Sequence, residues 1–363
     1  MDKEQLNKTA LQEKVGVSSQ EPTSKHAISN LKKKRQDQPS TATLLEGILS
    51  GNTAALSRSI TLIESHNAAH KVKANILIEN CLKHQKPSIR IGITGVPGVG
   101  KSTFIEALGT YLTALGKKVA VLAVDPSSSL SKGSILGDKT RMDALVKNPN
   151  AFIRPSAAGD SLGGVARHTR ETITLCETAG YDVILIETVG VGQSETTVHS
   201  MVDFFLLLKL AGAGDELQGI KRGIIEMADA IIINKADGDN LTAAKLAKVE
   251  FNRALHFYPA KASGWTPKVV LCSAIKNKGI DAAWNLISEY MSHTNKKGYF
   301  TKKRQEQNTF WLLQSIENQL KDQFFQNETI AKELKTQLEL ITENKRSPFA
   351  AAEYLLNLHK TLS

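Results

Sequence analysis

Short apolar runs alternate with longer segments of helical spacing between residues 89 and 291. The runs have the length of strands, and polar or glycine-rich residues follow them. This alternation is typical of an α/β protein with a doubly wound, mainly parallel sheet. It predicts strands at residues 89–94, 118–124, 182–186, 202–209, 230–233 and 269–272.

Apolar positions on both sides of this α/β region recur at helical spacing without strand-like runs. The stripe before it consists of Leu44, Leu45, Ile48, Leu56, Ile60 and Ile63. The two stripes after it consist of Leu312, Leu313, Ile316, Leu320 and Phe324, and of Ile330, Leu334, Leu338 and Ile341. Ser347 and Pro348 suit the N-cap and first turn of a third C-terminal helix.

These patterns divide the chain into four segments. Residues 1–41 are polar and lack helical periodicity, which predicts a disordered leader. Residues 42–85 are predicted to form a helical extension, residues 86–294 the α/β domain, and residues 295–363 a second helical extension. The last helices could pack as a globular unit of their own or form a dimer interface, and periodicity alone leaves both open.

At 363 residues and 41% hydrophobic content, the chain can bury one large core. The apolar runs, such as residues 204–208, are far shorter than the roughly 18–20 residues of a membrane-spanning helix. The first residues include Asp2 and Glu4 and lack the apolar stretch of a secretory signal. We therefore expect a cytoplasmic protein without a membrane partner.

The cysteines, histidines and basic residues are scattered. Cys81, Cys176 and Cys272 are widely spaced, so we expect packing residues rather than disulfides or zinc ligands. The nine histidines also lack metal-ligand spacing. The net charge of +10 comes from dispersed Lys and Arg, without the interleaved aromatic residues of a stacking platform for nucleic acid. We expect no nucleic-acid partner.

A glycine-rich run follows the first predicted strand and precedes a predicted helix. It has the phosphate-binding form Gly, four residues, Gly-Lys-Ser. In this setting, backbone N–H groups and the helix N-terminus favour phosphate binding. Lys101 would reach the β- and γ-phosphates, and Ser102 would ligate Mg²⁺. The predicted phosphate-binding residues are Gly95, Val96, Pro97, Gly98, Val99, Gly100, Lys101, Ser102 and Thr103.

The tetrapeptide NKAD, residues 234–237, follows the apolar strand at 230–233. Alone it would suit an ordinary surface turn, but ligands of parallel sheets bind at this end of the strands. The Asp237 carboxylate can accept hydrogen bonds from the N1–H and exocyclic amine of guanine. Adenine lacks this donor pair, so the motif favours GTP over ATP. Asn234 belongs to the same predicted site, and the stem of Lys235 would flank the base.

Polar residues also follow other predicted strands. Ser273 and Ala274 come after the last strand, where their backbone N–H groups could meet guanine O6. Asp125 follows the strand at 118–124, where it could serve Mg²⁺ or its water, or could open an ordinary Asp-Pro turn. Asp138 is a second candidate carboxylate.

Glu187 and Gly190 form an acid, two residues, glycine pattern after the strand at 182–186. The acid could hold Mg²⁺ through a water, and the Gly190 N–H could sense the γ-phosphate. Loss of that contact on hydrolysis would release the following loop. Val191 occupies the position where many small GTPases carry a water-orienting Gln, so we expect slow intrinsic hydrolysis.

A glycine-bounded segment at residues 212–223 could supply the missing group. It contains Gln218 and Lys221, either of which could reach a phosphate or a partner. The same segment could instead be the start of a surface helix with acids in its first turn.

Taken together, the motifs resemble the MeaB/ArgK family, which includes the human methylmalonic aciduria type A protein. The motifs are GVPGVGKST, VDPSS, SILGDKTRM, ETVGVGQSE, GAGDELQGIKRG and NKAD, and the resemblance spans roughly residues 44–356. It implies a P-loop GTPase of the SIMIBI class that forms a homodimer through its C-terminal helices. It also implies a chaperone that gates cofactor delivery to an adenosylcobalamin-dependent methylmalonyl-CoA mutase, or a related acyl-CoA mutase, and protects that enzyme from inactivation.

The resemblance also implies roles for individual residues. Gly98 to Thr103 would bind phosphates, and Asp237 would read guanine. Gln218 and Lys221 would lie in a third switch that responds to the partner and acts in activated hydrolysis. The implied magnesium site consists of Ser102, Asp125, Asp138 and Glu187. One departure from the family pattern is Lys209, Leu210 and Ala211 before the third switch, where a more neutral run ending in Pro is expected.

Two other functions use the same phosphate loop. An ATP-dependent kinase or transport-associated ATPase would require NKAD to be a mere turn, so that ATP would compete equally with GTP. A metal-insertion GTPase would require soft ligands, which the three scattered cysteines do not suggest.

Overall fold

One β-sheet organises the part of the chain that the computed structural model describes, residues 39–65, 67–124, 142–155, 162–188, 194–212 and 222–362. Neighbouring strands all run parallel, in the order β3-β2-β4-β1-β5-β6-β7. The strands are β1 Ile89–Gly95, β2 Val119–Val124, β3 Ala151–Arg154, β4 Val183–Thr188, β5 Phe204–Leu210, β6 Ala230–Asn234 and β7 Lys268–Leu271. The predicted parallel sheet is confirmed.

The six predicted strands are present, and none of their ends lies more than two residues from the predicted one. The prediction of six strands was nevertheless incomplete, because β3 was missed. This strand has four residues, lies at the sheet edge and ends in a charged residue, Arg154. A short, half-buried edge strand carries too few apolar residues to stand out in a sequence.

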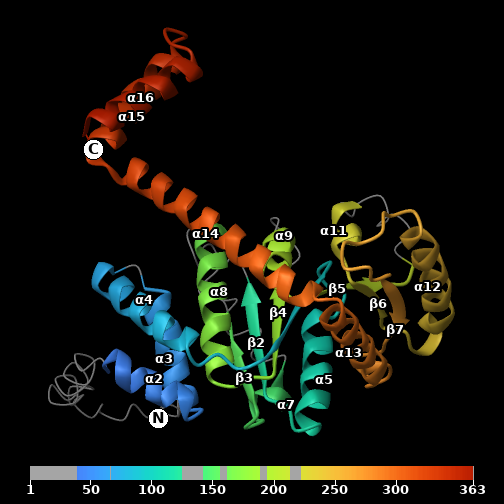
Figure 1. The fold of residues 1–363 in the computed structure, drawn as a ribbon. Coiled ribbons are helices and arrows are strands. Elements are labelled where there is room, and N and C mark those ends of the chain that lie inside the picture. The colour runs from blue at the N-terminus through green and yellow to red at the C-terminus, as the bar shows by residue number, and fades with distance from the viewer. Residues whose placement is uncertain are drawn as a thin grey trace, which may run out of the picture.

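Helices cover both faces of the sheet (Figure 1). The helices are α2 Thr41–Leu49, α3 Thr53–Ile63, α4 Ala68–Leu82, α5 Lys101–Ala114, α7 Asp143–Val146, α8 Leu162–Thr178, α9 Ser194–His199, α11 Arg222–Met227, α12 Leu241–Leu255, α13 Ile280–Lys296, α14 Tyr299–Gln326, α15 Glu328–Thr342 and α16 Pro348–Leu362. None of the described helices is long and apolar enough to span a membrane.

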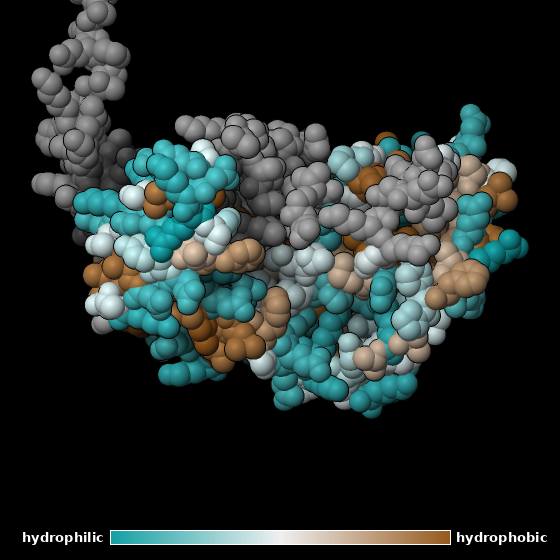
Figure 2. Space-filling model, turned by 90° about the horizontal axis from the view of Figure 1, so that it is seen from above, coloured by the Kyte–Doolittle hydropathy of each residue, from teal (hydrophilic) through white to brown (hydrophobic). Residues whose placement is uncertain are grey.

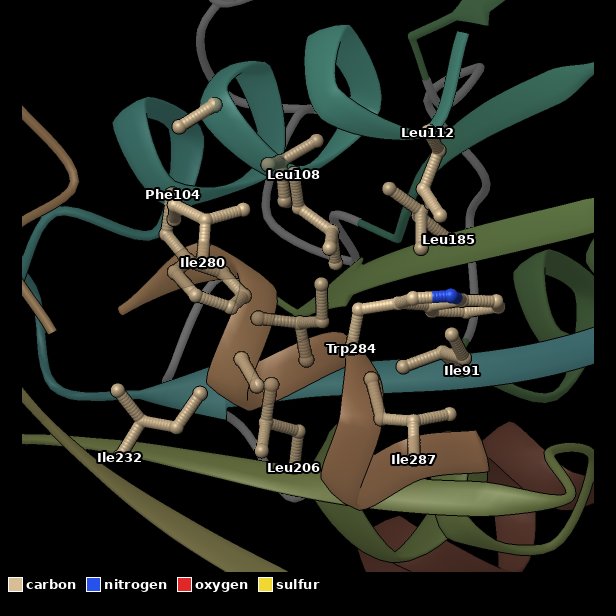
Figure 3. Close-up of a cluster of buried hydrophobic side chains, with 14 of the residues drawn as sticks. Ile91, Phe104, Leu108, Leu112, Leu185, Leu206, Ile232, Ile280, Trp284 and Ile287 are labelled. Atoms are coloured by element: carbon tan, nitrogen blue, oxygen red, sulfur yellow. The ribbon is translucent and has the colours of Figure 1, made fainter. Parts of the chain in front are cut away.

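The face covered by α5 and α13 holds a large hydrophobic core. Figure 3 shows Phe104 and Leu108 of α5 and Trp284 of α13 packed among strand residues such as Ile91 and Leu206. These side chains are at most 8% exposed. The core therefore fixes α5, whose first turn carries the phosphate-loop lysine, against the central strands.

The opposite face is covered by α8 and α9, and the helices α2 to α4 pack outside α8. Their apolar positions Leu44, Ile48, Leu56 and Ile60 are buried in this second core, so these residues of the N-terminal stripe face the sheet body. All three cysteines are buried, as expected for packing residues.

The helix α14 is attached to the body of the protein by polar contacts in its first half. Arg304 forms two hydrogen bonds of 2.9 and 2.7 Å with the carboxylate of Asp203, the residue before β5. Gln307 donates to the Val202 carbonyl at 2.8 Å, and the Trp311 indole donates to the Ser200 carbonyl at 3.3 Å. Successive turns of α14 thus bind the short segment between α9 and β5.

Beyond these contacts, α14 leaves the body and carries α15 and α16 outward (Figure 1). We call the projecting part of α14 together with α15 and α16 the C-terminal arm. The arm contains a groove of about 570 Å³ lined mainly by apolar side chains, including Leu320, Phe324, Leu338 and Leu355. Leu320 is 60% exposed, so the predicted apolar stripe of α14 is not covered within one chain.

Candidate nucleotide-binding site

Four of the predicted loops meet at the carboxyl edge of the sheet, because each follows a parallel strand. The phosphate loop follows β1, Glu187 lies near the end of β4, NKAD begins at the end of β6, and Ser273 comes after β7. Crevices at this edge are the usual ligand sites of open α/β sheets. The fold therefore brings together residues that are up to 179 positions apart in the sequence, from Gly95 to Ala274.

The phosphate loop is anchored at its middle and open at its tip. Val99 is fully buried in the core, whereas Pro97 and Gly98 are exposed. Gly100 has a φ of 92°, and a Cβ atom there would lie 2.8 Å from the side-chain nitrogen of Asn234. Glycine is needed at position 100 both for the left-handed backbone and for the close approach of NKAD.

Lys101, the first residue of α5, lies along the phosphate loop. Its Nζ donates to the Gly95 carbonyl at 2.8 Å and to the Val96 carbonyl at 3.2 Å. Burial lowers the pKa of Lys101, while the charges of Glu187 and Glu195 counter this by raising it. The two acids favour the charged ammonium that a phosphate would require.

Two candidate magnesium ligands are in direct contact. The Ser102 hydroxyl donates to Glu187 Oε1 at 3.1 Å, and Glu187 is 8% exposed. Among the residues that the structure describes, no cluster of three or more His, Cys, Asp or Glu side chains could hold a metal ion. The Ser102 and Glu187 oxygens nevertheless suit Mg²⁺, which commonly takes few protein ligands and fills its coordination with phosphate and water oxygens.

The base-reading motif packs directly on the phosphate loop. Asn234 donates to the Val99 carbonyl at 2.9 Å, and Lys235 Nζ donates to the Gly98 carbonyl at 2.9 Å. Lys235 has a φ of 56°, an uncommon left-handed conformation for a residue with a side chain. These contacts join the two loops that would hold the two ends of one nucleotide.

Asp237 and the loop after β7 form the far side of this region. The Ser273 hydroxyl donates to Asp237 Oδ2, which orients the half-buried carboxylate. The Ala274 N–H donates to Asn234 Oδ1 at 3.2 Å, and the Ser273 N–H donates to the Lys278 carbonyl at 2.9 Å. Both amides thus have protein acceptors here, and their contact with guanine O6 stays a prediction.

The other predicted site residues divide into two groups. Val96 packs against the core, and Thr103 is exposed on the first turn of α5. The second group lies outside the described residues and consists of Asp125, Asp138, Gly190, Gln218 and Lys221.

Sequence reasoning missed three buried polar residues of the site. Glu195, in the first turn of α9, is 7% exposed and acts electrostatically on Lys101. Thr188 donates to the Thr94 hydroxyl at 2.9 Å beneath the loops. The signal was available, since Thr188 and Glu195 lie within the quoted motif ETVGVGQSE and Thr94 directly precedes the phosphate loop.

Comparison with known proteins agrees with this geometry. Residues 56–329 match the family model described as methylmalonyl-CoA mutase-associated GTPase MeaB. The GTPase ArgK of Escherichia coli is 44% identical over 310 residues, which cover 85% of this chain and 94% of the relative. The mouse methylmalonic aciduria type A homolog, a mitochondrial protein, is 43% identical over 328 residues, covering 88% of this chain and 79% of the relative.

A solved structure is also similar. The crystal structure of a LAO/AO transport system kinase superposes with a TM-score of 0.71 at 36% identity, covering 88% of this chain and 97% of that chain. The P-loop fold, the guanine-type motif on the phosphate loop and these matches lead to one family. The chain belongs to the MeaB family of methylmalonyl-CoA mutase-associated GTPases.

Proposed function

We propose that this GTPase is a chaperone for an adenosylcobalamin-dependent methylmalonyl-CoA mutase or a related acyl-CoA mutase. In this role it gates loading of the cofactor and protects the mutase, using GTP binding and hydrolysis. The observation that carries the proposal is the packing of NKAD on the phosphate loop through Asn234 and Lys235, in a chain whose family is described by its association with that mutase.

The site residues support a division of labour for GTP and Mg²⁺. Lys101 would bind the β- and γ-phosphates, and Asp237 would select guanine. Ser102 and Glu187 would hold Mg²⁺ directly or through water, with Asp125 and Asp138 as further candidate ligands. The bound ion would neutralise charge that develops on the phosphates. Gly190 would sense the γ-phosphate.

We also propose that the protein is a homodimer joined by its C-terminal arm. The apolar groove and the exposed stripe of α14 support this, because monomeric proteins seldom expose large continuous apolar surfaces. The cytoplasmic location stays a prediction from the sequence.

The first experiment measures GTP turnover by the purified chain with and without the host's cobalamin-dependent mutase, with ATP as the parallel substrate. We expect slow GTP turnover that the mutase accelerates, and no turnover of ATP. Equal use of ATP would favour the alternative kinase or ATPase function. A GTP turnover rate that does not change when the mutase is added would indicate a GTPase with a different client.

A variant separates partner activation from nucleotide binding. Lys221→Ala should remove most of the mutase-dependent acceleration and leave GDP affinity nearly intact, whereas Lys101→Ala should abolish tight phosphate binding. A mutase response that is unchanged in Lys221→Ala would remove Lys221 from the activating switch.

A further inference from the structure

Two side-chain hydrogen bonds join the end of β4 to the residues on either side of the phosphate loop, and they lie on opposite faces of the sheet. On the α5 face, Ser102 donates to Glu187. On the opposite face, Thr188 donates to Thr94 at 2.9 Å. Successive strand residues point to opposite faces, so Glu187 and its neighbour Thr188 take part in different contacts.

The threonine pair lies under α9. Gly92, two residues before Thr94 on the same face of β1, would place a Cβ atom 2.9 Å from Val198 of α9. Thr94 is 1% exposed and Thr188 is fully buried. A buried hydroxyl that loses its partner is left desolvated and unpaired, so each threonine constrains the other.

The pair begins where the backbone pairing of β1 and β4 ends. The last register pair between these strands is Ile93 with Glu187. One residue later, Thr94 pairs with Leu207 of β5, and Thr188 pairs with Val124 of β2. At this point β1 enters the phosphate loop, and the hydroxyl bond is the described link that continues the β1–β4 connection.

We propose that Thr94 and Thr188 form a positioning pair that sets Glu187 relative to Ser102 and so tunes the Mg²⁺ affinity of the nucleotide-bound protein. The pair lies on the face of the sheet opposite the Ser102–Glu187 contact and acts through Glu187, the residue adjacent to Thr188. Contacts that orient metal ligands typically change metal affinity by about 10- to 100-fold when removed. The inference rests on the proposed magnesium site.

The test titrates Mg²⁺ into each protein bound to a fluorescent N-methylanthraniloyl derivative of GDP, and separately measures the affinity for this nucleotide in EDTA. The variants are Thr94→Val, Thr188→Val and the double variant, because valine keeps the shape and removes the hydroxyl. Thr188→Ser keeps the hydroxyl. Thr178→Val is the matched control. Thr178, the last residue of α8, is also fully buried, but its hydroxyl donates to the Cys81 carbonyl of α4 and the Thr174 carbonyl of α8.

We expect each valine variant to need about 10-fold more Mg²⁺ for half-saturation, at the lower end of the range for such contacts. The double variant should be no worse than the poorer single variant, because both lose the same bond. Thr188→Ser should recover most of the loss, and affinity in EDTA should not change. Thr178→Val should lower the melting temperature without moving the Mg²⁺ curve.

Two results would overturn the inference in different ways. Valine variants with the Mg²⁺ curve of the wild type, whatever their melting temperature, would reduce the pair to a structural contact. If the nucleotide affinity of the wild type is the same with and without Mg²⁺, both the proposed magnesium site and the positioning role are wrong.

Discussion

Asn234 is the residue on which the two ends of the nucleotide site meet. Its side chain donates to Val99 in the phosphate loop and accepts from the Ala274 N–H in the loop after β7. One buried amide therefore connects three loops that follow three different strands. Changes that displace Asn234 should weaken nucleotide binding even when no phosphate or base contact is altered.

Gly100→Ala tests this connection. The new Cβ atom would collide with the Asn234 side chain and would also strain a backbone with φ of 92°. We expect GDP affinity to fall by about 10-fold or more, corresponding to at least roughly 1.4 kcal/mol. Gly116→Ala is the matched control, because its φ is 79° and its Cβ would meet no atom within 4 Å. Equal GDP affinity in the two variants would contradict the role of Asn234.

Asp237→Asn tests the choice of base. The amide replaces one acceptor by a donor, so it mismatches guanine and matches the carbonyl of xanthine at the same position. We expect GDP to weaken by about 10²-fold or more and xanthosine diphosphate to gain, measured by competition between the two nucleotides. An unchanged base preference would remove Asp237 from the site.

At the scale of elements, the junction between α9 and α14 makes stability depend on pH. Burial lowers the pKa of His199 to about 4, and the charges of Lys303 and Lys261 lower it too, while Asp229 opposes them. The unfolded chain titrates near 6.5. Between these values the unfolded state binds a proton that the folded state excludes, so stability falls as the pH falls from about 6.5 towards 4.

His199→Phe should flatten this pH dependence. Phenylalanine can keep the edge-to-face packing on Phe205, whose ring centroid lies 5.3 Å from that of His199. We expect the loss of unfolding free energy between pH 7.5 and pH 5 to shrink by about 1–2 kcal/mol, measured by urea denaturation. His256→Gln, at an exposed position after α12, should leave the loss as it is in the wild type. An equal loss in the wild type and His199→Phe would show that other groups cause the decrease in unfolding free energy at acid pH.

The sequence pattern predicted most elements because strand and helix periodicities reflect burial directly. It failed at β3, where burial is incomplete, and on the inner face of α14. Arg304 and Gln307 lie there in polar contacts, and charged residues resemble a solvated surface in a periodicity analysis. Only the fold brings Asp203 opposite Arg304, 101 positions away in sequence.

The sequence predicted the composition of the site but not its individual contacts. The motifs predicted which loops meet, because the carboxyl ends of parallel strands share one edge. They could not predict that Asn234 would hold the phosphate loop or that Glu195 would act on Lys101, since both depend on loop conformation and on the placement of α9.

At the scale of the whole molecule, the visible face of the sheet body and the arm differ in how their apolar residues are distributed. Seen from above, hydrophobic residues form separate patches among hydrophilic ones (Figure 2). The arm differs, because its apolar side chains line a continuous groove. This contrast favours the arm as the surface for self-association.

Leu320→Asp tests the proposed dimer. A charge inside the apolar groove would be costly to bury, so we expect the variant to be monomeric and the wild type to have twice the mass of one chain in light scattering. Val72→Asp is the control, because Val72 on α4 is equally exposed at 60% but lies outside the groove. A dimeric Leu320→Asp, or a monomeric wild type, would exclude the arm as the dimer interface.

The length of α14 gives its attachment a mechanical consequence. The helix has 28 residues and ends at Gln326, 15 residues beyond its last attached residue, Trp311. At 1.5 Å per residue this projecting part is about 22 Å long, and a tilt of about 5° at Trp311 would move its far end by about 2 Å. Its attached turns bind the segment directly after α9, the helix that follows the predicted γ-phosphate sensor. A small shift of that segment would therefore move the end of the arm by a larger distance. By reciprocal coupling, a partner that holds the arm in one position would also influence the segment after α9.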